Sequence, residues 1–146
     1  MSDVVAARVQ EVRKMRVWTI KQLAERCAEL GFPELTPNAL YNLEGGRRDE
    51  EGRRRRNVTV DELLCLADAL DVAAVNLLVP LEEVPYWYTP ERQESSGRVR
   101  EWIRGTRPLP STNSRWFKIV RPDSDWTDED VKKTLQDDCE AGREDG

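Results

Sequence analysis

The sequence predicts a mainly α-helical protein, with a five-helix bundle over residues 1–80 and a small Trp-rich α(+β) extension behind it. Two observations support this fold class. Apolar residues recur at spacings of three, four and seven in five successive segments, which is the period of an amphipathic helix. In addition, Thr19, Thr36 and Thr59 stand where they can cap the starts of three of these segments.

The first two helices are predicted over residues 4–15 and over the segment that follows Thr19. Two helices cannot bury their apolar faces alone, so we expect a core shared with the helices that follow. Trp18 is expected to join this core. The other inward residues predicted for these two helices are Val5, Val9, Val12, Ile20, Leu23, Ala24 and Cys27.

A third helix is predicted over residues 36–44, because Thr36 supplies a capping hydroxyl and Pro37 suits the first helical position. Leu40 and Leu43 then face inward. Amide and phenol groups on the free face of a short helix suit the major groove of DNA. The side chains predicted on that outer face are Asn38, Tyr41 and Asn42.

A fourth helix is predicted after Thr59, and a short fifth helix over residues 73–79 ends before Pro80. Asp61 and Glu62 in the first turn of the fourth helix suit the positive end of its dipole. The residues expected to face inward are Val60, Leu63, Leu64, Ala67 and Leu70, followed by Leu77 and Leu78.

Three ordered segments carry a resemblance to a known family: TIKQLAE, LTPNALYNLEGG and VDELLCLADALDVAAVNLL. Across residues 4–79 the chain resembles the phage-repressor/Cro type of helix-turn-helix protein, the XRE family. The later segment GRVREWIRGTRPLP is similar to extensions behind this domain in actinobacterial regulators. The resemblance implies a lambda-repressor-like helix-turn-helix bundle, and it implies that Glu44 is an internal ion-pair or capping partner.

Two segments depart from the family pattern and affect the expected docking angle. The turn CAELGFPEL between the second and third helices is long, and so is GGRRDEEGRRRRNVT after the third. The second segment holds the densest group of cations. The net charge is −5, but residues 1–56 hold 12 Lys+Arg against 9 Asp+Glu, whereas residues 121–146 hold 4 against 10. Since phosphate affinity depends on local cations, the acidic tail does not argue against DNA binding.

The resulting hypothesis separates residues that contact bases from residues that contact phosphates. For the cations and asparagines the alternative is an ordinary solvated surface, and Tyr41 could instead pack on the second helix. The expected base contacts are Thr36, Pro37, Asn38, Tyr41 and Asn42. The expected phosphate contacts are Thr19, Lys21, Gln22, Arg47, Arg48, Arg53, Arg54, Arg55 and Arg56.

Residues 81–137 are predicted to form the extension, and residues 138–146 a flexible acidic tail. The extension is too aromatic for a disordered linker, because it holds Trp87, Trp102, Trp116 and Trp126. We expect a helix within residues 90–105, with Val99, Trp102 and Ile103 on one face, a strand over 115–121, and a last helix after Thr127. The extension either docks onto the bundle or serves as a dimer contact or effector pocket.

An enzyme is not expected, because the chain has no histidine and no glycine-rich phosphate loop. We expect no metal, no cofactor, no self-cleaving domain and no membrane span. Cys27, Cys65 and Cys139 are scattered, which fits a reducing cytoplasm. The predicted function is a sequence-specific DNA-binding transcriptional regulator, a homodimeric repressor at the nucleoid. The alternative is a protein-interaction adaptor or antitoxin-like control protein of a phage or mobile element, which binds its partner through the Trp-rich extension.

Overall fold

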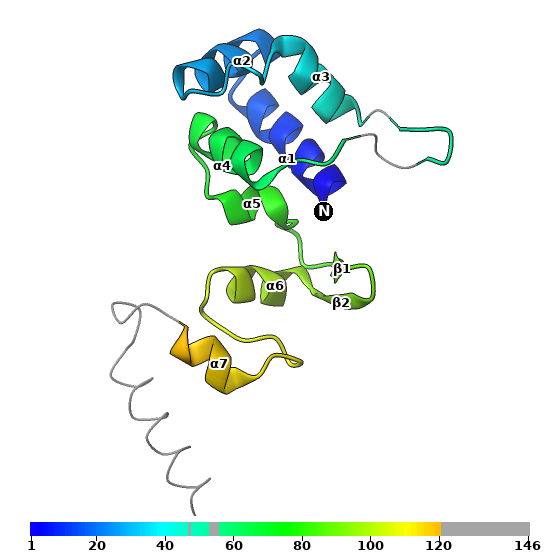
Figure 1. Ribbon diagram of the computed structural model, residues 1–146, viewed down its shortest axis with the longest axis vertical. Helices are drawn as coiled ribbons and strands as arrows, with labels where there is room; N and C mark the ends of the chain where they lie inside the picture. Colours follow the sequence, from blue (N-terminus) through cyan, green and yellow to red (C-terminus); the bar gives the residue numbers. More distant parts are fainter. Residues whose placement is uncertain (47, 53–55, 121–146) are drawn as a thin grey trace, which may run out of the picture. The chain divides into compact units, whose positions relative to one another are not determined.

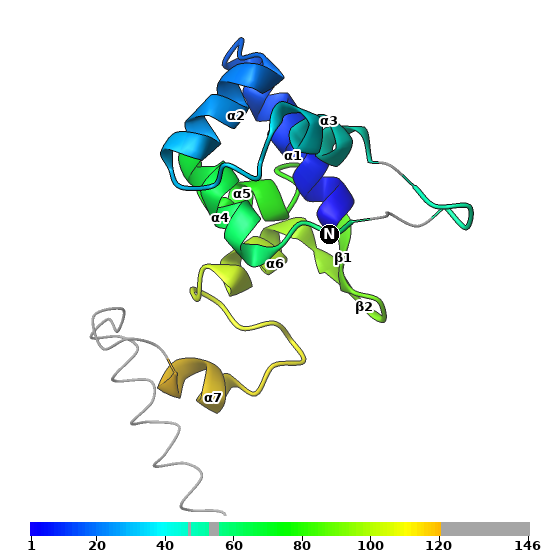
Figure 2. The same ribbon diagram turned by 45° about the horizontal axis from the view of Figure 1, so that its top comes forward.

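The computed structural model describes residues 1–46, 48–52 and 56–120, and within these it contains seven helices and a single two-stranded sheet (Figures 1 and 2). The mainly helical class is therefore confirmed. The chain divides into a compact unit Met1–Arg107 and a second unit that begins at Pro108. The second unit contributes one described helix, α7 (Ser114–Ile119).

The first unit contains five helices close to the positions predicted for them, followed by a hairpin and a sixth helix. The elements are α1 (Ser2–Met15), α2 (Ile20–Glu29), α3 (Pro37–Gly45), α4 (Val60–Ala69), α5 (Ala74–Leu78), β1 (Pro85–Thr89), β2 (Arg92–Ser95) and α6 (Ser96–Ile103). Thr19 and Thr59 form reciprocal capping boxes with Gln22 and Glu62, and Thr36 caps α3 through the amide of Ala39.

One apolar core joins α1 to α5. Val5, Val9, Leu23, Ala24 and Cys27 are buried as predicted. The core continues through the third and fourth helices to the fifth, with Leu40, Leu43, Ala67, Leu70 and Leu77 buried, while Trp18, Ile20, Leu63 and Leu78 are half-buried against it. The long turn between α2 and α3 adds Leu35, which is 1% exposed.

The prediction was wrong for Val60 and Leu64 of α4, whose side chains are 71% and 55% exposed. The buried face of this helix instead runs through Glu62, Cys65 and Leu66 and on to Ala69. Glu62 takes an inward position because its carboxylate caps the helix start by accepting from the Thr59 amide at 3.0 Å. With Glu62 on the inner face of α4, Val60 and Leu64 lie on its outer face.

The extension differs from the prediction in two places. The strand expected over residues 115–121 is wrong for residues 115–119, which belong to the helix α7. The sheet is instead an antiparallel hairpin earlier in the chain, with Tyr86 opposite Glu94 and Trp87 opposite Gln93. The predicted helix is confirmed as α6, with Val99 buried and Trp102 half-buried, but Ile103 is 38% exposed. The helix after Thr127 and the tail 138–146 lie outside the described residues.

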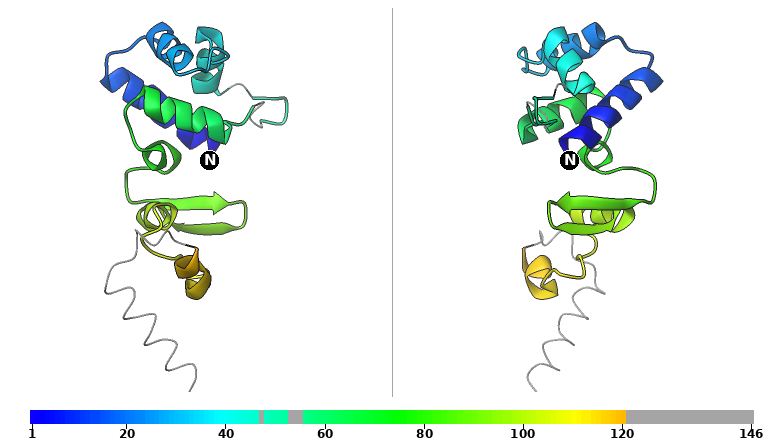
Figure 3. Two further views of the ribbon diagram at one scale, coloured as in Figure 1. Left: turned by 60° about the vertical axis from the view of Figure 1, so that its left-hand side comes forward. Right: turned by 90° about the vertical axis from the view of Figure 1, so that its right-hand side faces the viewer.

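The hairpin and α6 lie beside α5, on the side of the bundle away from α2 and α3 (Figure 3). Polar contacts to the end of α5 and the segment after it hold them there. The Tyr86 hydroxyl donates to the Leu78 carbonyl at 2.9 Å, and Arg100 donates to the Pro80 carbonyl. Tyr88 and Trp102 pack ring against ring, with centroids 5.8 Å apart. Residues 81–107 therefore dock onto the bundle.

Val17 is strained, because it has a φ of 57° in the turn between α1 and α2 while its side chain is 86% exposed. This left-handed conformation costs free energy in a β-branched residue but not in glycine. We predict that Val17→Gly raises the free energy of unfolding by about 1 kcal/mol in urea titrations. Val60→Gly, at an exposed helical position, should lower it instead. A loss of stability in Val17→Gly would contradict this account.

Candidate nucleic-acid interface

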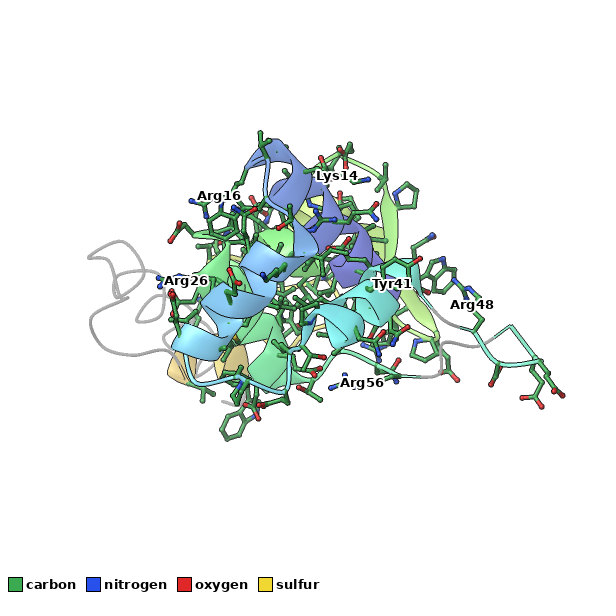
Figure 4. The ribbon with its side chains drawn as sticks, turned by 90° about the horizontal axis from the view of Figure 1, so that it is seen from above. Lys14, Arg16, Arg26, Tyr41, Arg48 and Arg56 are labelled. Carbon is green, nitrogen blue, oxygen red and sulfur yellow. The ribbon has the colours of Figure 1, made fainter. Side chains whose placement is uncertain are left out.

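The helix α3 buries one face in the core and presents polar side chains on the opposite face. Leu40 is fully buried and Leu43 is 9% exposed, so the helix cannot turn about its axis without opening the core. Tyr41 is 66% exposed on the outer surface that Figure 4 views from above. Asn38 is exposed beside it, and Asn42, one turn further, is half-buried. The structure therefore places these three predicted base-contact side chains together on the outer side of α3.

A buried ion pair fixes the far end of α3. The Arg13 guanidinium of α1 donates two hydrogen bonds of 2.7 Å to the Glu44 carboxylate, and its third nitrogen, Nη1, donates to the Trp18 carbonyl at 2.7 Å. The two side chains are 10% and 3% exposed. The hydrogen bond to Glu44 raises the pKa of Arg13 although burial opposes it. The internal ion-pair role expected of Glu44 is confirmed, and its partner ties α3 to α1 and to the turn before α2.

A hollow of about 350 Å³ lies along the flank of α3. Its walls come from α3, including Asn38 and Asn42, and from the segment that leads into α4. Asn57, which the sequence analysis did not single out, contributes a third amide here. The lining residues are Thr36, Asn38, Ala39, Asn42, Leu43, Arg56, Asn57, Val58 and Glu62.

Arg56 makes an intramolecular contact that the sequence analysis did not predict. It forms an ion pair with Glu62, whose side chain is only 6% exposed. The pair neutralises a carboxylate that α4 needs as a cap. A phosphate contact by Arg56 stays a prediction, and a phosphate there would compete with Glu62 for the same guanidinium.

The other residues expected to contact phosphates differ in the contacts that they make within the protein. Thr19 and Gln22 are engaged in the capping box, where the Thr19 amide donates to the Gln22 side-chain oxygen at 2.8 Å. Lys21 is 78% exposed, with Glu25 at 3.7 Å. Arg48 donates to the Gly52 carbonyl at 2.8 Å and lies 3.4 Å from Asp3. The remaining four, Arg47, Arg53, Arg54 and Arg55, lie outside the described residues.

Three further cations lie on the α1 and α2 side of the bundle in Figure 4, and the sequence analysis did not single them out. Figure 4 labels Lys14 and Arg16 near the end of α1, and Arg26 on α2. Arg16 stacks on the Trp18 ring at 4.7 Å and binds Asp71 at 2.7 Å. Helical periodicity could have placed Lys14 and Arg26 at the ends of their helices, but no local signal predicts the contacts of Arg16.

Comparisons with known proteins do not identify the chain. No family model, no curated protein and no solved structure matches it. In the part of the chain that the structure describes, no three Cys, Asp or Glu side chains gather where they could hold a metal ion. No helix among those residues is long and apolar enough to cross a membrane.

Breaking the Arg13–Glu44 pair tests whether it anchors α3. Glu44→Ala leaves a buried guanidinium without its partner, so we expect a loss of about 3–5 kcal/mol in the free energy of unfolding, measured by urea titration. Replacing both residues with apolar ones, Arg13→Met with Glu44→Leu, should recover most of that loss. Glu29→Ala, which breaks an exposed pair with Arg26, is the control and should cost much less. Equal losses in Glu44→Ala and Glu29→Ala would show that the pair does not anchor the helix.

Proposed function

We propose that this protein is a sequence-specific DNA-binding transcriptional regulator of the phage-repressor/Cro helix-turn-helix type. In this proposal α2, the turn after it and α3 form the helix-turn-helix, and α3 enters the major groove. The observation that carries the proposal is the outer face of α3, where Asn38, Tyr41 and Asn42 project from a helix anchored by the core and by the Arg13–Glu44 pair. A rigid support of this kind favours defined side-chain geometry at base edges.

Asn38 is the side chain best placed to read a base. It is exposed near the start of α3, directly after the Thr36 cap and Pro37. An asparagine amide can bind both N6 and N7 of adenine, which are exposed in the major groove. Tyr41 offers a hydroxyl and a ring to the same groove. Asn42 and Asn57 line the hollow beside Asn38, so the amide-bearing surface extends along the flank of the helix.

Phosphate contacts would fix the register of α3 without reading sequence. Lys21 lies in the first turn of α2, where the positive end of the helix dipole also favours an anion. Arg48 follows α3, and the arginines from Arg53 to Arg55 continue the same segment in the sequence. These groups supply the local cations that counterion release requires, despite the net charge of −5.

The regulatory mechanism that fits this geometry is repression by occlusion. Two copies bound at half-sites one helical turn apart would cover the duplex and exclude the polymerase. A homodimer gains affinity because the second half-site is bound from an already tethered partner. The protein would act at the nucleoid in the cytoplasm.

A second function, a protein-interaction adaptor, is favoured by one observation. Trp87 of β1 is 56% exposed, while its neighbour Tyr86 is buried and Tyr88 packs on Trp102. An exposed tryptophan on a docked hairpin is typical of a protein-binding surface. A mobility shift with DNA fragments from around the gene separates the two functions. An adaptor retains no fragment selectively, and a Trp87→Ala variant of a regulator should shift the same fragment as the wild type.

Salt sensitivity is the first prediction for the regulator. If four to six phosphates are neutralised, the slope of log affinity against log salt concentration should be roughly −4 to −5. Fluorescence anisotropy titrations at several salt concentrations measure it. Absence of preference for any genomic fragment at low salt would rule out the regulator function.

The second prediction separates base reading from phosphate binding. Asn38→Ala should cost about 1–3 kcal/mol of discrimination at one base position and leave the salt slope unchanged. Arg54→Ala together with Arg55→Ala should weaken binding to every sequence and flatten the slope by about one to two units. Affinity selection of random duplexes with each variant measures base preference. Neither variant should change the melting temperature, because Asn38 is exposed and the arginines lie outside the predicted core.

The opposite outcome for these variants would assign base reading to a segment other than α3. If the arginine pair alters base preference and Asn38→Ala does not, α3 is not the reading surface. The segment after α3 would then determine specificity, as a basic arm in the minor groove.

A further inference from the structure

The hollow along the flank of α3 has the size and the walls of a small-molecule site. Its volume of about 350 Å³ falls at the lower end of the range in which such sites are found. Ala39, Leu43 and Val58 give it apolar walls, and Asn42 and Asn57 add side-chain amides. A phosphate group alone would leave these hydrocarbon walls in contact with water, so the hollow suits a ligand that also has an apolar part.

Arg56 supplies this hollow with an accessible positive charge. Its side chain is 60% exposed, and Figure 4 labels it near α3. The guanidinium donates to the Glu62 carboxylate through Nη2. Among the described residues this pair is the one polar contact of the guanidinium, so Nε and Nη1 can donate to a ligand.

Glu62 lines the hollow without offering a free carboxylate that would repel an anion. Its Oε1 accepts from Arg56, and its Oε2 accepts from the Thr59 amide at 3.0 Å. The hollow also lies beside the starts of two helices, since Thr36 caps α3 and the segment before α4 forms another wall. The positive ends of both helix dipoles add to the charge of Arg56 and favour a bound anion.

We propose that the hollow is a binding site for a small organic acid, a monocarboxylate whose apolar body is about the size of an aromatic ring. The carboxylate accepts from Nε and Nη1 of Arg56, which then bridges it to Glu62. A guanidinium can serve two carboxylates in this way because its N–H groups point in several fixed directions. The apolar body packs against Ala39, Leu43 and Val58.

This site shares side chains with the proposed reading face. Asn38 and Asn42 line the hollow and also belong to the outer side of α3. Binding of the acid rests on the hollow alone, whereas an effect on DNA rests on the proposed function. With that function, a bound acid occupies the flank of the helix that enters the groove, so it lowers the affinity for DNA and acts as an inducer.

The experiment titrates the full chain, without DNA, with benzoate, phenylacetate and cyclohexanecarboxylate. Heteronuclear NMR spectra follow the side-chain amide signals of Asn42 and Asn57, which should shift and saturate with at least one of these acids. Benzamide has the same ring as benzoate without the charge, and it should bind about tenfold more weakly. Acetate, which has the charge without the body, should also bind more weakly than benzoate.

Two variants test the apolar walls and the charge separately. Ala39→Leu fills the hollow and should abolish binding of every acid, whereas Ala28→Leu, at an exposed position of α2, is the matched control and should bind like the wild type. Arg56→Gln together with Glu62→Gln removes both charges at once, leaves no unpaired carboxylate and keeps a residue that can form the capping box. In this double variant benzoate should bind no better than benzamide.

The proposal is overturned if no acid shifts the Asn42 and Asn57 signals at millimolar concentration. It is equally overturned if the acids bind Ala39→Leu as well as they bind the wild type, or if the preference for benzoate survives in the double variant.

A mobility shift with and without the acid tests the inducer role separately. If the acid binds and DNA affinity is unchanged, the inducer role is wrong and the acid site stands. If the protein binds no DNA fragment at all, the proposed function fails, and the NMR titration still decides the acid site.

Discussion

The ion pair between Arg13 and Glu44 is the contact on which the candidate site depends. Its three hydrogen bonds connect α1, the turn before α2 and the end of α3. Because both groups are buried, a displacement of α3 would leave charge without a partner in an apolar environment. The core packing of Leu40 and Leu43 sets the rotation of α3, and the ion pair holds its C-terminal end, so the outer polar face has a fixed direction.

The helices of the bundle could be predicted because their signals are local. Caps at Thr19, Thr36 and Thr59 determine where α2, α3 and α4 begin, and apolar spacing indicates which face of each helix is buried. The same periodicity failed at Val60 and Leu64, since two overlapping apolar stripes fit α4 and only the tertiary contacts choose between them. The hairpin was missed because its strands are short and because Tyr86 and Tyr88 contact α5 and α6, which the sequence does not place beside them.

The candidate site was predictable in part for the same reason. Asn38, Tyr41 and Asn42 follow from the period of α3 once Leu40 and Leu43 are inside. The ion pair of Arg56 with Glu62 was not predictable, because both the loop geometry and the inward position of Glu62 depend on packing. Asn57 was missed because an isolated asparagine in a loop carries no periodic signal, and only the hollow beside α3 shows its neighbours.

The docking of the hairpin and α6 onto the carbonyls of Leu78 and Pro80 has a consequence for how this chain could evolve. The sequence predicts a boundary at Pro80, where the fifth helix ends, yet a gene fusion there would remove the donors to these carbonyls and uncover the end of the core. The compact unit ends at Arg107, so recombination between Arg107 and Pro108 would preserve every one of these contacts. Exchange of C-terminal segments should therefore be tolerated at that junction, with residues 81–107 inherited together with the bundle.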